Sequence, residues 1–171
     1  IHFHEDDLTD AGWRDVVSWS VPKHLQSGQY AFKIIQEDSE EYVPFFVRAP
    51  KGRRGSSIAY LVPSATYLAY ANIRLASGGL LGETRIVDAN QAFLSAHKDV
   101  GFSLYEHHAD GSGVHFSSRL RPVLNFRPKT GTWAFNADTH ITAWLAAIDQ
   151  DFDVVTAVSY THLTLPTILL V

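Results

Sequence analysis

A short apolar run at residues 57–62, ended by Pro63, is the feature that most constrains the fold of this chain. Such a run is typical of a strand covered on both faces in a parallel sheet. Segments with apolar residues at helical spacing follow at 88–97 and 136–148, and a second apolar strand is predicted at 152–155. Strands alternating with helices favour an open α/β domain, whose ligands bind beyond the carboxyl ends of the strands.

The first 50 residues have a different pattern. Residues 13–21, 29–35 and 42–47 are rich in β-branched and aromatic side chains, and the polar, acidic residues 36–41 suit a hairpin connection. These strands predict a β-sandwich-like segment at the end of a β domain.

The predicted domain organisation follows from where the composition changes. The Gly-, Ser- and charge-rich residues 51–57 predict a linker between the β segment at 1–50 and the start of a truncated catalytic α/β domain at 58–156. The chain begins at Ile1 and contains no methionine, so we expect its start to be a truncation.

Residues 157–171 change character abruptly. Their Ser-Tyr-Thr-His-Leu-Thr-Leu-Pro-Thr core looks like translated sequencing-adapter sequence, so we expect a non-native tail with no packed role. The alternative is a genuine strand, because apolar residues recur in it: Leu163, Leu165, Ile168 and Leu170.

Composition narrows the function classes. The chain is 46% hydrophobic and 19% charged, as in soluble globular proteins, and it has neither an apolar run of about 18 residues nor a signal peptide. We therefore expect a cytoplasmic protein with no membrane partner. Zero cysteines exclude disulfides, thiolate metal sites and a cysteine nucleophile within this stretch. The net charge of -4, with one short basic cluster at residues 51–54, argues against nucleic acid as a partner.

Two segments carry polar and phenolic groups that could form a site. Residues 62–72 place Tyr67, Tyr70 and Asn72 at or just past the carboxyl end of the first predicted α/β strand, where such folds bind ligands. The alternative is that these tyrosines pack at the rim of the core with their hydroxyls hydrogen-bonded.

Residues 103–115 form the second segment, which contains several potential metal ligands: Tyr105, His107, His108, Asp110 and His115. His107 and His108 also suit a solvated loop pair, because adjacent side chains point in different directions and no HExxH spacing accompanies them. The acidic residues 5–7 lack EF-hand spacing and predict a solvated turn. No G-x-S-x-G motif occurs, which argues against a serine hydrolase.

Residues 2–156 resemble the large (beta) subunit family of N,N-dimethylformamidase. The resemblance lies in a series of segments whose order and spacing match: HFHEDDLTDAGW, SGQYAFKI, YVPFFVRAP, LVPSATYLAYAN, SLYEHHADGSGVHFSSRLRPVLNFRP and NADTHITAWL. It implies a glutamine-amidotransferase-like α/β domain and an enzyme that cleaves N,N-dimethylformamide or similar small N-substituted formamides to formate and amine with metal-activated water. It also implies a small companion subunit and a higher oligomer.

The resemblance further implies a mononuclear Fe(III) held by two tyrosines and a glutamate. Its tyrosines fall on Tyr105 and on Tyr70, with Tyr67 as the alternative to Tyr70, whereas the glutamate has no counterpart in this chain. We therefore expect Tyr70 and Tyr105 to converge, and the chain alone to be inactive. Candidates for the pocket or for contacts to the ligands are Asn72, His107, His108 and Asp110.

Two other functions fit the same residues. The chain could belong to a non-catalytic carbohydrate- or small-ligand-binding module, whose tyrosines stack on a planar ligand. Alternatively, the enzyme could hold zinc rather than iron, on ligands drawn from the second segment: His107, His108, Asp110 or His115.

Overall fold

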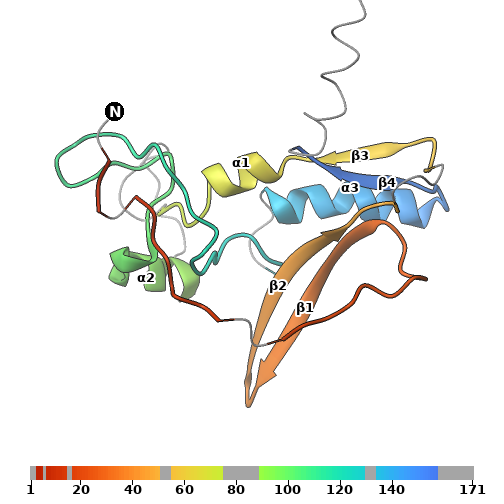
Figure 1. Cartoon of the computed structure of the whole chain (residues 1–171), viewed down its shortest axis with the longest axis horizontal. Coiled ribbons are helices and arrows are strands. Elements are labelled where there is room, and N and C mark those ends of the chain that lie inside the picture. Colours follow the sequence, from red (N-terminus) through yellow and green to blue (C-terminus); the bar gives the residue numbers. More distant parts are fainter. Residues whose placement is uncertain are drawn as a thin grey trace, which may run out of the picture. The chain divides into compact units, whose positions relative to one another are not determined.

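The chain forms a mixed α/β structure, which confirms the predicted class. A computed structural model describes residues 3–5, 7–14, 17–50, 55–74, 89–129 and 134–157. The elements follow in the order β1 (Gly28–Gln36), β2 (Ser39–Val47), β3 (Ala59–Val62), α1 (Ser64–Ala69), α2 (Ala89–Ala96), a 3-10 helix η1 (Lys98–Val100), α3 (Phe135–Ala147) and β4 (Asp153–Thr156) (Figure 1). The sandwich and the amidotransferase-like topology remain predictions. None of the described helices is long and apolar enough to cross a membrane.

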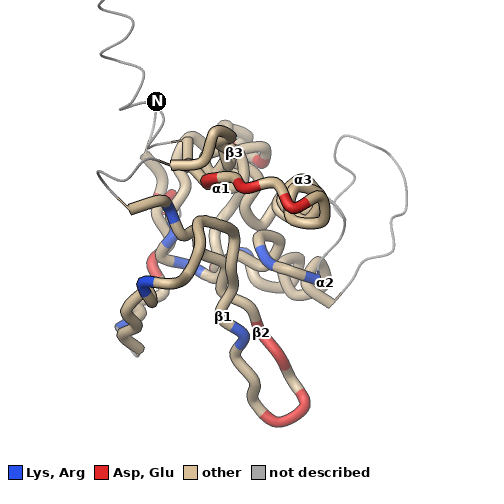
Figure 2. The backbone as a smooth tube through the Cα atoms, turned by 90° about the vertical axis from the view of Figure 1, so that its right-hand side faces the viewer, with Lys and Arg blue, Asp and Glu red and all other residues tan. Residues whose placement is uncertain are grey.

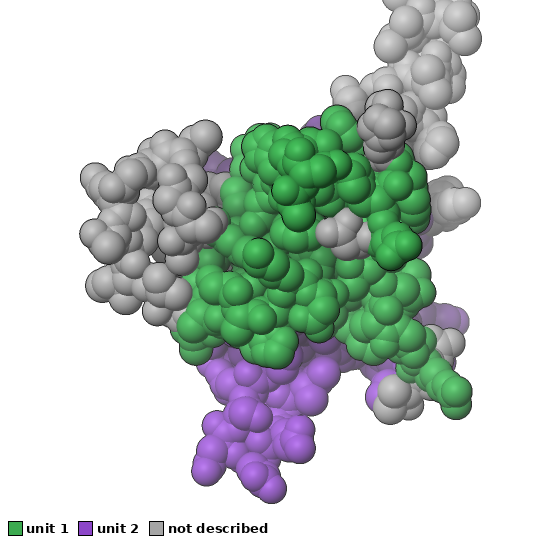
Figure 3. All heavy atoms as spheres, turned by 90° about the vertical axis from the view of Figure 1, so that its left-hand side faces the viewer, with its two compact units in different colours: residues 1–16, 66–125 green, residues 17–65, 126–171 purple. Residues whose placement is uncertain are grey.

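The chain packs as two compact units, each built from two stretches of sequence. One unit draws on residues 1–16 and 66–125, and the other on residues 17–65 and 126–171 (Figure 3). The predicted domain boundaries remain predictions, because residues 51–54 of the linker and 158–171 of the tail lie outside the described residues.

The predicted hairpin is confirmed. β1 and β2 pair antiparallel from Gly28 opposite Val47 to Gln36 opposite Ser39. The turn between them includes Glu37 at a φ of 50°. Acidic residues gather at the tip of this hairpin (Figure 2).

The strand expected at residues 13–21 is wrong, since its described residues, 13–14 and 17–21, form no strand. One of its aromatic residues instead packs against the hairpin. The ring of Trp19 packs edge-on against Phe32 and Phe45 of the hairpin, at centroid distances of 5.2 and 5.6 Å. Aromatic side chains favour strands because they cover pleated surfaces, and here one covers a sheet without joining it.

The two apolar strands of the second half are confirmed as a parallel pair. Ala59 lies opposite Asp153 and Val62 opposite Thr156. Val62 and Val154 are fully buried, whereas Leu61 is 44% exposed. The expectation that the first strand is covered on both faces is therefore wrong for this chain. The helices expected at 88–97 and 136–148 are confirmed as α2 and α3.

A helix that the sequence did not predict follows β3. Helix α1 begins at Ser64, directly after Pro63, and ends at Ala69. Tyr67 therefore lies within a helix, and Tyr70 and Asn72 lie in the turn after it, one short helix farther from the strand end than expected. This turn begins the polar site of the unit formed by residues 1–16 and 66–125.

Candidate functional site

Tyr70 and Tyr105 form a stacked pair. Their ring centroids are 4.1 Å apart and the ring planes differ by 9°. Two hydrogen bonds support this approach, because the carbonyl of Ala69 accepts both the Leu104 N–H at 3.0 Å and the Ser103 hydroxyl at 2.9 Å. The end of α1 and the segment carrying Tyr105 are thus held side by side, as the convergence prediction requires.

The two phenol hydroxyls of this pair also interact. Their hydrogen bond is the main cause that raises the pKa of Tyr70 above its ordinary value of 10, and burial adds to it. Tyr105 is 58% exposed, so the pair is open to solvent within the described structure. Tyr67 is only 3% exposed and lies inside α1. Of the two candidates, Tyr70 is the tyrosine that stacks on Tyr105.

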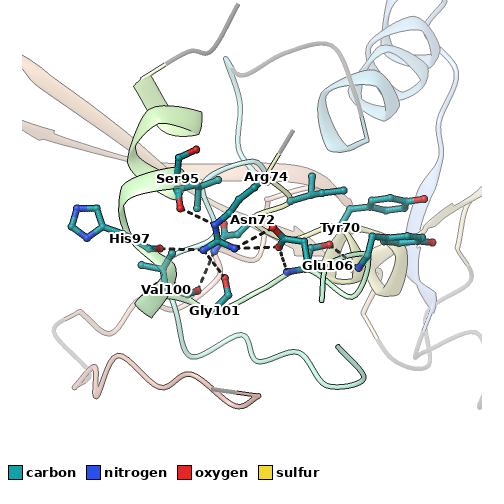
Figure 4. A network of polar contacts seen from close by, with 12 residues as sticks. Tyr70, Asn72, Arg74, Ser95, His97, Val100, Gly101 and Glu106 are labelled. Atoms are coloured by element: carbon teal, nitrogen blue, oxygen red, sulfur yellow. Dashed lines mark hydrogen bonds and ion pairs between the residues drawn. The ribbon is translucent and has the colours of Figure 1, made fainter. Parts of the chain in front are cut away.

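A largely buried ion pair, which we did not expect from the sequence, lies beside the tyrosines. Both carboxylate oxygens of Glu106 accept hydrogen bonds from Nη1 of Arg74, at 3.3 and 3.2 Å. Arg74 also donates to the carbonyls of Leu94 at 2.7 Å, His97 at 3.1 Å and Gly101 at 3.3 Å (Figure 4). One arginine therefore joins the residues after α1, the end of α2 and the segment that carries Tyr105.

Glu106 also fixes the backbone next to Tyr105. Its Oε2 accepts the N–H of Ser103 at 2.7 Å, and the Ser103 hydroxyl accepts the N–H of Tyr105 at 3.2 Å. Arg74 packs over the Phe102 ring, with the guanidinium carbon 5.0 Å from its centroid. The carboxylate thus positions the Tyr105 segment through its backbone.

Asn72 links the segment after α1 to residues 122–125 by hydrogen bonds. It is fully buried at a φ of 58°, a conformation that Asn tolerates better than most residues. Its side chain donates to the carbonyl of Pro122 at 2.7 Å and accepts the N–H of Leu124 at 2.9 Å. Asn125 accepts the Asn72 N–H at 2.9 Å and donates to the Tyr70 carbonyl at 2.7 Å. In this structure the amide of Asn72 therefore binds the backbone of residues 122–124, next to the Asn125 that bonds the Tyr70 carbonyl.

Two of the remaining candidates, His108 and Asp110, contact residues of the N-terminal segment. His107 is exposed, whereas His108 is only 6% exposed, which confirms that the adjacent histidines point in different directions. Asp110 lies near Nε2 of His4 at 3.1 Å, and its hydrogen bonds with Ser112 hold the pKa of its carboxyl well below the usual range.

The burial of Asp7 corrects another expectation. The solvated turn expected at residues 5–7 is wrong for Asp7, which is only 5% exposed and lies 3.2 Å from Nε2 of His108. His4, Asp7 and His108 are the group of His, Asp or Glu side chains that converges closely enough to hold a metal ion within the described part of the chain. Within the described residues, no such group is formed by the alternative zinc ligands His107, His108, Asp110 and His115.

Comparison with known proteins identifies the family. The family model described as "N,N-dimethylformamidase beta subunit-like, C-terminal" matches residues 1–170. The chain belongs to this family. The N,N-dimethylformamidase beta subunit of Paracoccus aminophilus is 38% identical over 165 residues, and that of Alcaligenes sp is 37% identical over 167 residues. Each match covers 90% of this chain but 22% of the relative, so the chain spans about a fifth of the curated relatives' length. The resemblance found in the sequence is confirmed.

Proposed function

We propose that this chain contributes two tyrosine ligands to the iron site of an amide hydrolase. The substrate class is N,N-dimethylformamide and similar small N-substituted formamides, which the complete protein cleaves to formate and an amine. The stacked, hydrogen-bonded pair of Tyr70 and Tyr105 carries the proposal, because a family member has here brought two phenol oxygens from distant segments to one place.

The residues fit a ferric ion in donor chemistry and in placement. Phenolate oxygens are hard, anionic donors that suit a hard trivalent cation, whereas ferrous sites more often use two histidines and one carboxylate. Tyr70 and Tyr105 present their hydroxyls side by side, so a modest separation of the two oxygens would admit a shared ion. The backbone on both sides of the pair is already fixed by hydrogen bonds.

The third anionic ligand comes from outside this chain in our proposal. Glu106 is the nearest carboxylate in sequence to Tyr105, but both of its oxygens are engaged by Arg74 and one also accepts the Ser103 N–H. Removing it from Arg74 would leave a buried charge without compensation. We therefore assign Glu106 a positioning role and expect the chain alone to bind iron weakly and to hydrolyse nothing.

The chain's own residues hold the metal and manage protons. Bound iron supplies a Lewis acid that polarises the amide carbonyl and lowers the pKa of a water molecule. Tyr70 and Tyr105 must release their phenol protons to serve as anionic ligands, so iron uptake releases protons and tightens as the pH rises. Arg74 and Asn72 keep the backbone of the two tyrosine segments in register while this occurs.

The names of the relatives support a further part of the proposal. Both are beta subunits, so we infer that the complete protein assembles with a second, companion subunit. Neither nucleic acid nor a membrane enters the proposed assembly.

Substitution of the tyrosines tests the proposal. In the complete protein, Tyr105→Phe keeps the ring stack but removes one anionic oxygen. Visible phenolate-to-iron absorption, iron content and release of dimethylamine should therefore fall together. Tyr70→Phe should do the same and Tyr67→Phe should not, with Tyr30→Phe on the hairpin as the matched control. Full activity and full iron content in Tyr105→Phe would overturn the assignment. Tight ligand binding without iron in the unmodified protein would instead support a binding module.

A further inference from the structure

We propose that His4, Asp7 and His108 form a second metal site, for a divalent ion of the zinc class, which fastens the N-terminal segment to the loop at residues 106–114. This site is separate in residues and in donor chemistry from the proposed tyrosine site. It joins two stretches of sequence within one compact unit.

The three side chains already converge. One ligand atom from each lies within 4.8 Å of the others. Nε2 of His108 is 3.2 Å from Oδ1 of Asp7, and Nδ1 of His4 is 3.7 Å from Oδ2 of Asp7. The side chains of Asp7 and His108 are 1% and 3% exposed, and that of His4 is 21% exposed. Two imidazoles and a carboxylate are thus gathered where little water reaches them.

The backbone around Asp7 and His108 is held independently of any ion. The His4 carbonyl accepts the Asp7 N–H at 3.1 Å, and Oδ2 of Asp7 accepts the His4 N–H at 2.6 Å. His108 sits in a tight turn, where its N–H donates to the Ser112 carbonyl at 2.9 Å and its carbonyl accepts the Gly111 N–H at 3.0 Å. An ion would therefore find Asp7 and His108 pre-positioned.

A second observation concerns the far nitrogen of His4. Its Nε2 lies 3.1 Å from Oδ2 of Asp110 and 3.1 Å from the Ser112 hydroxyl. Histidines that bind metals usually donate their other ring N–H to a carboxylate, which fixes the tautomer and directs the lone pair at the ion. When His4 carries its proton on Nε2 and donates it to the Asp110 carboxylate, its lone pair is on Nδ1, the nitrogen that lies near Asp7.

The donor set selects the ion. Imidazole nitrogen and carboxylate oxygen without thiolate suit Zn²⁺, which commonly takes three protein ligands and a water. The rings of His4 and His108 are stacked at 3.8 Å with planes 11° apart, and tetrahedral zinc needs donor atoms about 3.3 Å from one another. One ring must therefore tilt out of the stack when the ion binds, and we assign this movement to His4 because its side chain is the more exposed of the two. His108 also borders a cavity of about 540 Å³.

Zinc titration of the metal-free chain tests the site. Isothermal titration calorimetry should show one equivalent of Zn²⁺ per chain, and zinc should raise the thermal unfolding midpoint because it binds the folded state. His108→Ala and Asp7→Asn should each weaken zinc binding at least tenfold. His107→Ala is the matched control, since it removes an exposed imidazole from the adjacent position, and it should bind zinc like the parent chain.

The remaining outcomes are also decisive. If His108→Ala does not fold, His4→Gln tests the site at a less buried position and should weaken zinc binding to a similar degree. Tyr105→Phe should leave the zinc equivalent intact, which separates this site from the tyrosine pair. Absence of a saturable equivalent, or equal zinc affinity in the parent and His4→Gln chains, would overturn the proposal. The cluster would then be a structural contact between His108 and Asp7.

Discussion

Glu106 and Glu40 are carboxylates with similar partners in different surroundings. Glu106 meets Arg74 and a backbone N–H, and the side chains of the ion pair are 15% and 6% exposed. Glu40 on β2 meets Lys33 and Lys129, each at 2.5 Å, and these side chains are 38%, 44% and 64% exposed. Figure 4 shows Arg74 bonded both to Glu106 and to backbone carbonyls, whereas Figure 2 shows the acidic end of the hairpin that carries the second group.

The contribution of an ion pair to stability depends on its exposure to water. In water, a pair of charges gains little on association, and exposed pairs contribute about 0–1 kcal/mol. A buried charge has lost its hydration. Removal of its partner therefore strongly lowers the free energy of unfolding, even where the intact pair adds little net stability. We therefore expect Glu106 and Arg74 to be essential to the fold around Tyr105, and the Glu40 cluster to be dispensable.

The largest effect should come from Arg74→Ala. It leaves Glu106 charged and largely shielded from water and also removes the donor from three backbone carbonyls, so we expect a loss of about 3–5 kcal/mol in the free energy of unfolding. Urea denaturation measures this loss, with Arg119→Ala as a control at an exposed arginine. A loss below about 1 kcal/mol for Arg74→Ala would show that the buried and exposed pairs are equivalent.

Asn72→Gly should give the next largest effect. Glycine accepts the φ of 58°, so this change isolates the amide side chain from the backbone conformation. Carbonyl and N–H groups that now bond the amide would lose their partners, at a cost of about 2–4 kcal/mol. Glu37→Gly, at a φ of 50° in the exposed hairpin turn, is the matched control and should be neutral. Equal effects of the two changes would contradict the role given to the amide.

Local sequence patterns were sufficient for most of the fold. The β1–β2 hairpin was expected from two β-rich runs around a polar connection, β3 and β4 from short apolar runs, and α2 and α3 from apolar residues at helical spacing. Helix α1 was missed because six residues complete too few turns to show a helical period. The strand at 13–21 was wrong because composition indicates aromatic packing and cannot supply a partner strand.

The site was less predictable, for a physical reason. Arg74 and Glu106, like His4 and His108, meet through tertiary folding across long stretches of chain, and no local spacing encodes such a contact. The pairing of Tyr70 with Tyr105 was expected from the family resemblance rather than from the residues themselves. An arginine among apolar residues, such as Arg74 after residues 67–73, was the signal that could have indicated a buried charge.

Tyr105→Phe should change the titration of Tyr70 more than it changes the free energy of unfolding. The hydrogen bond between the hydroxyls raises the pKa of Tyr70, and its loss should lower that pKa toward the ordinary value. Because the folded-state pKa is the higher one, this stabilisation is complete below pH 10 and is lost as the pH rises through the folded-state pKa. NMR titration of the Tyr70 ring measures the shift, with Tyr30→Phe as the control. An unchanged Tyr70 titration would contradict the paired hydroxyls.

The smallest effect should come from Glu40→Gln. Hydrogen bonds from Lys129 and Lys33 lower the pKa of Glu40 from 4.5 to about 2. A lowered folded-state pKa adds stability above about pH 4.5, and that stability is lost as the pH falls from 4.5 toward 2. At pH 7 the variant should therefore unfold at a slightly lower temperature than the parent chain. At pH 2 the two should unfold at the same temperature. Because Glu40 is exposed, about 1 M salt, with a screening length near 3 Å, should remove the difference at pH 7. Thermal unfolding at both pH values and both salt concentrations measures this. A difference that persists in high salt would mean that Glu40 behaves like the buried Glu106.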